Sequence, residues 1–195
     1  MRLLPVVIFL VASCSQQNAV PAADLSSSDL AIYQTVLDSM FVASEGGRLR
    51  QLVLRDSTRV MDGQDLARTL NNDFFGYPVD TAAVRDLLTR GRAARSLKEA
   101  TRLPLRIPVT LVDRQTLDSL PQKDLERYWS EFYEKYPGSN GIIEISTIGY
   151  GSNGDLAILL VDRGCGSLCG HGYIVALRRV AGVWRIASIR QTWIS

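Results

Sequence analysis

The feature that most constrains the fold is the last third of the chain, residues 141–195, where apolar runs alternate with glycine-bearing turns. Four runs stand out: Ile142–Tyr150, Asp155–Arg163, Tyr173–Val180 and Val183–Ile194. Asn153-Gly154 is the dipeptide best suited to a two-residue type I′ hairpin, in which both positions need φ > 0. Ala181-Gly182 is a weaker form of the same signal. The runs therefore predict a four-stranded antiparallel meander.

Helical patterns come before this meander. Apolar residues recur at helical spacing in 29–43, 81–90 and 121–136, less clearly in 64–72, and strands are expected at 51–60 and 107–114. The run Asp155–Arg163 is apolar in both alternation sets, so both of its sides should be covered, by helices on one face and by a partner or a pocket on the other. We predict an α+β fold in which a curved antiparallel sheet is packed by N-terminal and central helices. In element order this is loosely similar to nuclear-transport-factor-2-like domains, whose meander wraps a pocket.

The N-terminus has the pattern of an export signal. Arg2 gives a short positive region, Leu3 to Ala12 is apolar, and small residues then lead to Cys14. Ten apolar residues form about 15 Å of helix, half of a hydrocarbon core of about 30 Å, so the segment is too short to span a membrane. An ordinary signal peptide with an incidental cysteine is the alternative interpretation.

The stretch Val11-Ala12-Ser13-Cys14 resembles the lipobox of bacterial lipoproteins. In that family a signal peptidase cuts before the cysteine, which is then acylated. The resemblance implies a lipid bilayer as partner through Cys14, and Ser15 after it is similar to lipoproteins sorted to the outer membrane. We therefore expect a signal peptide over 1–13, a lipidated cysteine and flexible tether over 14–28, and one domain over 29–195, at the periplasmic face of the cell envelope.

The connection between the second and third runs carries Cys165, Cys169 and His171, the only histidine. If the residues between the cysteines turn the chain, the two thiols face each other across a hairpin mouth, at a distance that suits a disulfide. Exported proteins form such bonds. A metal site using all three side chains, a redox-active dithiol and a cysteine nucleophile remain alternatives. We expect the structural disulfide, with no metal and no cofactor.

No catalytic motif stands out in the sequence, so catalytic residues are not assigned. If a carboxylate pair does cleave glycosidic bonds, Glu144 and Asp162 on the predicted strands are the first candidates, and a buried pair with raised pKa values would favour that activity.

The basic stretch 85–106 is either a solvated surface or a site for polyanions. The leading hypothesis is an envelope lipoprotein with a binding or structural role, its ligand an envelope protein, a glycan or a small molecule. An envelope hydrolase is the alternative, and nucleic acid is not expected as a partner.

Overall fold

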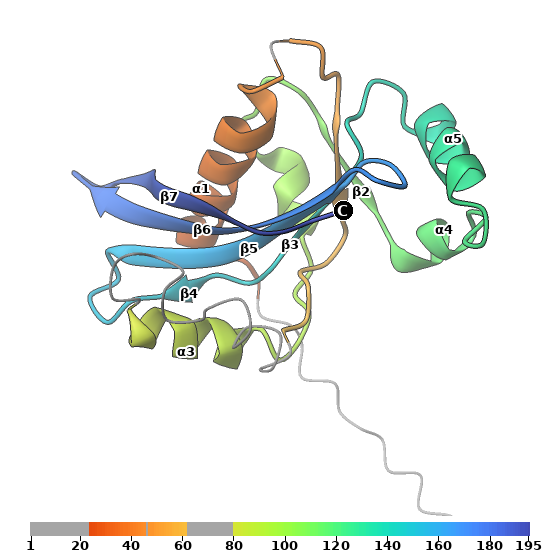
Figure 1. The fold of residues 1–195 in the computed structure, drawn as a ribbon. Coiled ribbons are helices and arrows are strands. Elements are labelled where there is room, and N and C mark those ends of the chain that lie inside the picture. The colour runs from red at the N-terminus through yellow and green to blue at the C-terminus, as the bar shows by residue number, and fades with distance from the viewer. Residues whose placement is uncertain (1–23, 46, 62–79) are drawn as a thin grey trace, which may run out of the picture.

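The computed structural model describes residues 24–45, 47–61 and 80–195, and shows an α+β fold in which helices pack on an open mixed sheet (Figure 1). The helices are α1 (Ser27–Leu37), α3 (Thr81–Arg90), α4 (Arg114–Asp118) and α5 (Leu125–Lys135), with a π-helical turn η1 (Asp38–Val42) and a 3₁₀ turn η2 (Lys98–Arg102). The strands are β1 (Leu52–Arg55), β2 (Val109–Val112), β3 (Ile142–Ile145), β4 (Gly149–Tyr150), β5 (Leu156–Gly164), β6 (Gly170–Val180) and β7 (Val183–Ile194).

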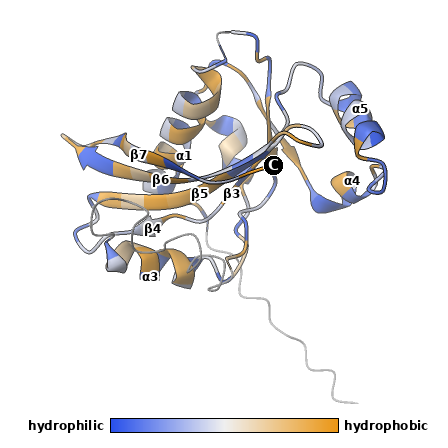
Figure 2. Cartoon of the chain, viewed as in Figure 1, coloured by the Kyte–Doolittle hydropathy of each residue, from blue (hydrophilic) through white to orange (hydrophobic). Residues whose placement is uncertain are grey.

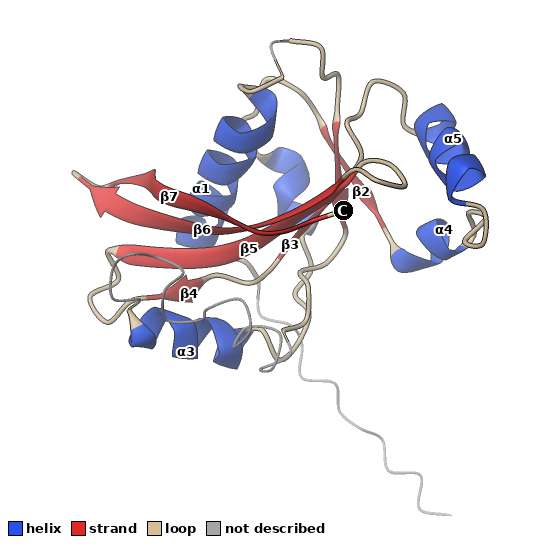
Figure 3. Ribbon diagram, in the orientation of Figure 1, coloured by secondary structure: helices blue, strands red, loops and turns tan. Residues whose placement is uncertain are grey.

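The described strands form one sheet in the order β2-β1-β3-β5-β6-β7, with β4 also paired to β5 (Figure 3). The run β3-β5-β6-β7 is antiparallel, so the C-terminal meander is confirmed. The sequence analysis did not foresee that β1 pairs in parallel with both β2 and β3. Parallel neighbours need long crossover connections, and here these carry α3 and η2 between β1 and β2, and α4 and α5 between β2 and β3.

Two details of the predicted meander are wrong. The run Ile142–Tyr150 is not continuous: it breaks after β3, where the Ser146 hydroxyl accepts a hydrogen bond from the backbone N–H of Leu160 and donates one to the carbonyl of Thr147. The backbone N–H of Ser146 still donates to the Leu160 carbonyl, and the next pairing with β5 is at β4.

The turn signals are also reversed in strength. At Asn153-Gly154 only the glycine has positive φ, within a longer loop closed by a hydrogen bond from Gly154 N–H to the Gly151 carbonyl. At Ala181-Gly182 both residues have positive φ, 50° and 82°, as a type I′ turn requires.

Helices cover both faces of the sheet, whereas the sequence predicted helices on one face only. On β5 one alternation set, Ala157, Leu159 and Val161, belongs to a core that includes residues of α1, η1 and η2. The other set, Ile158 and Leu160, packs with α3. Figure 1 shows α1 and α3 on opposite sides of the sheet.

A third apolar cluster lies where α4 and α5 cover β1, β2 and β3 on the α3 side. The aromatic stripe of α5 belongs to it: Phe132 and Tyr136 are buried, and Tyr128 and Trp129 are half-buried. These aromatic residues of α5 therefore pack in the core, while Leu125 is exposed.

Local capping explains where the helices begin and end. Asp80 caps α3 through the N–H of Ala82 and Gly91 ends it, so both predicted ends are confirmed. α5 begins four residues later than predicted, at Leu125, because Asp124 provides the N-terminal cap, accepting from the N–H of Arg127.

Other expectations fall outside the described residues: the export signal, Cys14, the tether up to residue 23, and the helical piece at 64–72. The predicted strand 107–114 is confirmed as the short edge strand β2. Among the described helices, none is both long enough and apolar enough to cross a bilayer.

Candidate functional site

A row of polar side chains crosses the sheet between the area covered by α3 and the area covered by α5. We call this set, Arg55 on β1, Glu144 on β3, Asp162 on β5 and Trp193 on β7, the charged row. Glu144 and Asp162 are directly opposite each other in the β3–β5 ladder, and Asp162 is opposite Gly172, which is in turn opposite Trp193. Like charges placed directly opposite on neighbouring strands repel. The two carboxylates therefore need compensating partners.

Arginines from the β1 segment provide that compensation. The Nε atom of Arg55 lies 4.0 Å from Oε1 of Glu144. Arg59, four residues after it, donates to Oδ2 of Asp162 at 2.6 Å, and the Asp162 side chain is 15% exposed. Segments 89 and 103 residues apart in sequence thus supply a positive charge to each of the two carboxylates.

The indole of Trp193 completes the environment of Asp162. Its Nε1–H donates to Oδ1 of Asp162 at 2.9 Å, reaching across Gly172 on β6. A Cβ at Gly172 would overlap both the indole and the carboxylate, so only glycine fits beneath the ring. Both oxygens of Asp162 are therefore occupied, one by Arg59 and one by Trp193.

The β1 end of the charged row opens into a cleft of about 670 Å³, within the range of about 300–1,000 Å³ typical of small-molecule sites. Arg55 and Glu144 contribute to its lining, but Asp162 does not. The lining is otherwise mostly polar and of mixed charge: Asp56, Ser57, Thr58, Arg59, Asp113, Arg114 and Gln115, with Val60 and Ala94 as its apolar members. A cleft of this kind suits a polar ligand that both donates and accepts hydrogen bonds.

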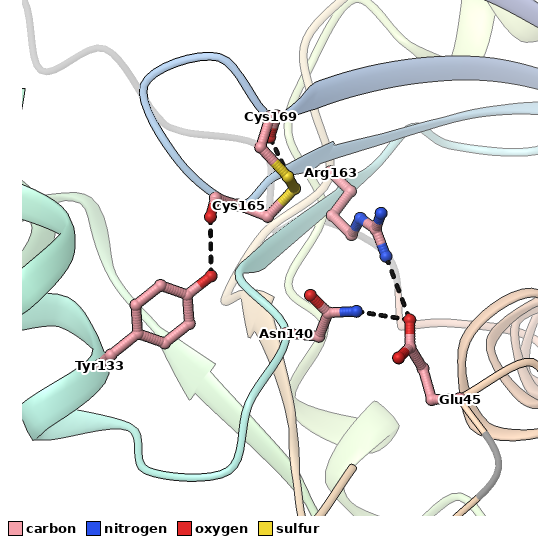
Figure 4. The surroundings of a disulfide bond; sticks show 6 residues. All are labelled: Glu45, Tyr133, Asn140, Arg163, Cys165 and Cys169. Atoms are coloured by element: carbon pink, nitrogen blue, oxygen red, sulfur yellow. Dashed lines mark hydrogen bonds and ion pairs between the residues drawn. A yellow bond between two sulfur atoms is a disulfide. The ribbon is translucent and has the colours of Figure 1, made fainter. Parts of the chain in front are cut away.

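The predicted disulfide is present in the loop between β5 and β6 (Figure 4). Cys165 and Cys169 are bonded, with their Cα atoms 5.0 Å apart, and the N–H of Cys165 donates to the carbonyl of Cys169 at 2.7 Å. On the α5 side, the Tyr133 hydroxyl donates to the Cys165 carbonyl at 2.8 Å, which ties the loop to the helix. The bridge thus fixes a short loop at the end of the sheet.

His171 lies close to the bridge without completing a metal site. One donor atom from each of Cys165, Cys169 and His171 falls within 4.8 Å of the others. Because the two sulfur atoms are bonded to each other, neither is a free thiolate to bind a metal. The imidazole stacks on Tyr173, with ring centroids 6.2 Å apart.

A second polar cluster joins α1 to α3 and includes the buried carboxylate of Asp29, which is 1% exposed. It accepts from the backbone N–H of Ser26 in a capping box, from Arg90 at 3.1 Å and from the Tyr150 hydroxyl at 2.9 Å. Burial opposes ionisation of Asp29, but the hydrogen bonds from Ser26, with the Arg90 charge and the Tyr150 hydroxyl, outweigh it and hold the pKa of the carboxyl below 3.8. Burial, with the negative charge of Asp29, raises the pKa of Tyr150 to about 12.

This second cluster is structural. Its members cap α1 and connect this helix to α3 and β4. Arg90, one of the basic residues of the 85–106 stretch, forms an ion pair with Asp29 in this cluster.

The structure therefore brings together the two carboxylates that the sequence singled out, Glu144 and Asp162, and the two cysteines. The sequence analysis missed Arg55, Arg59 and Trp193. A signal for Arg55 was present, because it directly follows the apolar run Leu52–Leu54 and so marks a polar end of a buried strand.

Comparison with known proteins gives no relative for this chain: no family model matches it, and neither does any curated protein or solved structure.

Proposed function

We propose that the protein is a lipid-anchored bacterial envelope lipoprotein whose domain binds a small polar ligand or a short glycan in the cleft beside the charged row. The observation that carries the anchoring is the stretch from the apolar Leu3–Ala12 segment to Cys14. The Cys165–Cys169 bridge supports it, because structural disulfides belong to oxidising compartments.

The cleft lining supports binding of a polar ligand. Its charged residues balance in number, because the lining contains three arginines and three carboxylates: Arg55, Arg59, Arg114, Asp56, Asp113 and Glu144. Such a surface offers hydrogen-bond donors and acceptors to sugar hydroxyls or to a zwitterion, and it offers little apolar area to an apolar ligand.

The alternative, a hydrolase that uses Glu144 and Asp162, has one observation in its favour: the two carboxylates are cross-strand neighbours. The geometry around Asp162 weighs against it. Both of its oxygens already accept hydrogen bonds, and it does not line the cleft. A glycosidase needs both carboxyl groups to reach the bond that is cleaved.

The anchoring is tested by metabolic labelling with a palmitate analogue. We expect the native protein to take up label and to fractionate with membranes, and the Cys14→Ala variant to do neither. A Cys14→Ala protein that is still labelled would overturn the proposal.

The binding is tested by measuring the melting temperature of the protein with free amino acids, short peptides and oligosaccharides as probes. We expect at least one probe class to raise the melting temperature, and Arg55→Ala to abolish that rise. Arg127→Ala is the matched control, because Arg127 lies on the exposed side of α5 and pairs with Glu131 outside the cleft. No response to any probe, or an equal response from the Arg55→Ala protein, would contradict binding in this cleft.

A further inference from the structure

The outer end of the β6–β7 hairpin exposes apolar side chains that the fold does not use. Val180 and Val183 flank the tight turn Ala181-Gly182 and are 53% and 55% exposed. Figure 2 shows this apolar turn next to hydrophilic residues at the end of β6. Turns of this kind are ordinarily polar, so the two exposed valines indicate a surface that contacts another molecule.

Arginines surround the same turn, and no acidic residue lies within the turn itself. The segment from Arg178 to Arg185 contains three arginines and no carboxylate. Arg178 and Arg185 are directly opposite each other in the β6–β7 ladder and both are exposed. Within the described part of the chain, no carboxylate forms an ion pair with either of them. Two opposed guanidinium groups repel, and an anion placed between them would relieve the repulsion.

The hairpin end contacts the first turn of α1, the described helix that is nearest to Cys14 in sequence. The indole N–H of Trp184, next to Val183 on β7, donates to the hydroxyl of Ser28 in the first turn of α1 at 3.2 Å. Leu25 is buried in the core and Ser26 caps α1, so only residues 15–24 of the predicted tether precede the packed domain. Ten residues of a flexible tether would reach about 17 Å. A lipid anchored at Cys14 would therefore hold this end of the domain close to the bilayer surface.

We propose that the β6–β7 hairpin end is a membrane-contact surface. Val180 and Val183 enter the interfacial region, and Arg178 and Arg185 bind the phosphate groups of anionic lipids, for which the guanidinium fork is well shaped. The inference rests on the proposed lipid anchor, because two valines alone bury too little area to hold a protein on a membrane. It adds an orientation: the hairpin end faces the bilayer.

The test uses the full lipidated protein carrying Val183→Cys, labelled with an environment-sensitive thiol dye and reconstituted into vesicles. Phosphatidylcholine vesicles are compared with vesicles that also contain phosphatidylglycerol. We expect a blue shift of the dye emission that is larger on the anionic vesicles. The ratio of membrane-facing to solvent-facing dye should fall about fivefold for each of Arg178→Gln and Arg185→Gln.

Dye at Ile194→Cys, on the other end of β7 and 68% exposed, is the matched control and should not respond to lipid charge. Equal emission from the Val183 position on both vesicles would overturn the proposal, as would a shift that survives both arginine substitutions. The same shift with soluble polyglutamate and no vesicles would identify an acidic polymer as the partner and also overturn it.

The parent protein without the new cysteine separates this failure from failure of the anchor. Cys165 and Cys169 are bonded to each other, so dye uptake by the parent reports a free thiol at Cys14 and refutes the lipidation itself.

Discussion

Replacing Asp29 with asparagine should lower the free energy of unfolding by about 2–3 kcal/mol at neutral pH. Asparagine keeps the shape of the side chain and an oxygen for the N–H of Ser26, but it removes the charge that faces Arg90. Truncating one partner of a buried ion pair costs about 3–5 kcal/mol, because the other charge stays buried without compensation. We expect less here, since the Arg90 side chain is 20% exposed and lies 4.0 Å from Asp86.

The effect should depend on pH in a defined direction. The pKa of Asp29 in the folded protein lies below its ordinary value of 3.8, so the stabilisation by the carboxylate is complete above that value and is lost as the pH falls through the folded-state pKa. The difference between the native protein and Asp29→Asn should therefore shrink in acid.

The assay is urea unfolding followed by circular dichroism, at neutral pH and at about pH 3, below the ordinary carboxyl pKa. Asp118→Asn is the matched control: its pair with Arg114 is exposed, so the expected change is within about 0.5 kcal/mol. A loss below about 1 kcal/mol for Asp29→Asn, or a loss of equal size at both pH values, would refute the assignment of a stabilising buried carboxylate.

Three further substitutions test other contacts. Replacing Cys165 and Cys169 together by serine should cost about 2 kcal/mol in urea unfolding, as expected for a five-residue loop, and an unchanged midpoint would mean that the bridge adds no stability. Phe132→Ala, in the core beneath α5, should lower the free energy of unfolding by about 3–5 kcal/mol. Leu125→Ala, at an exposed position of the same helix, should change it by no more than about 0.5 kcal/mol. Losses of similar size in the two variants would contradict the burial pattern. Gly172→Ala should lower the free energy of unfolding by about 1–3 kcal/mol and change the tryptophan emission, because the added methyl group displaces the indole of Trp193. Unaltered emission would show that this indole does not lie over Gly172.

Local signals were enough to predict some elements. Helix α3 was predicted with both ends because Asp80 and Gly91 act within one turn of the residues they cap. The disulfide was predictable because Cys165 and Cys169 are close in sequence and lie between two strands that form an antiparallel pair.

Features that depend on distant parts of the chain were not predictable in the same way. The break in the first run of the meander depends on bonds between Ser146 and Leu160 of the neighbouring strand. The Arg59–Asp162 pair spans 103 positions and requires the parallel pairing of β1 with β3, for which the sequence contains no local mark. The sequence could name Asp162 as a carboxylate of interest, but the ladder register was needed to show what surrounds it.

The central claim is that the mature chain begins at an acylated Cys14 and resides where thiols pair. The most direct test is the intact mass of the protein extracted from membranes of its native host. We predict a chain of residues 14–195 carrying acyl groups at the cysteine and the two-hydrogen deficit of one disulfide. An unacylated chain that still begins at Met1 and has free thiols at Cys165 and Cys169 would contradict the account.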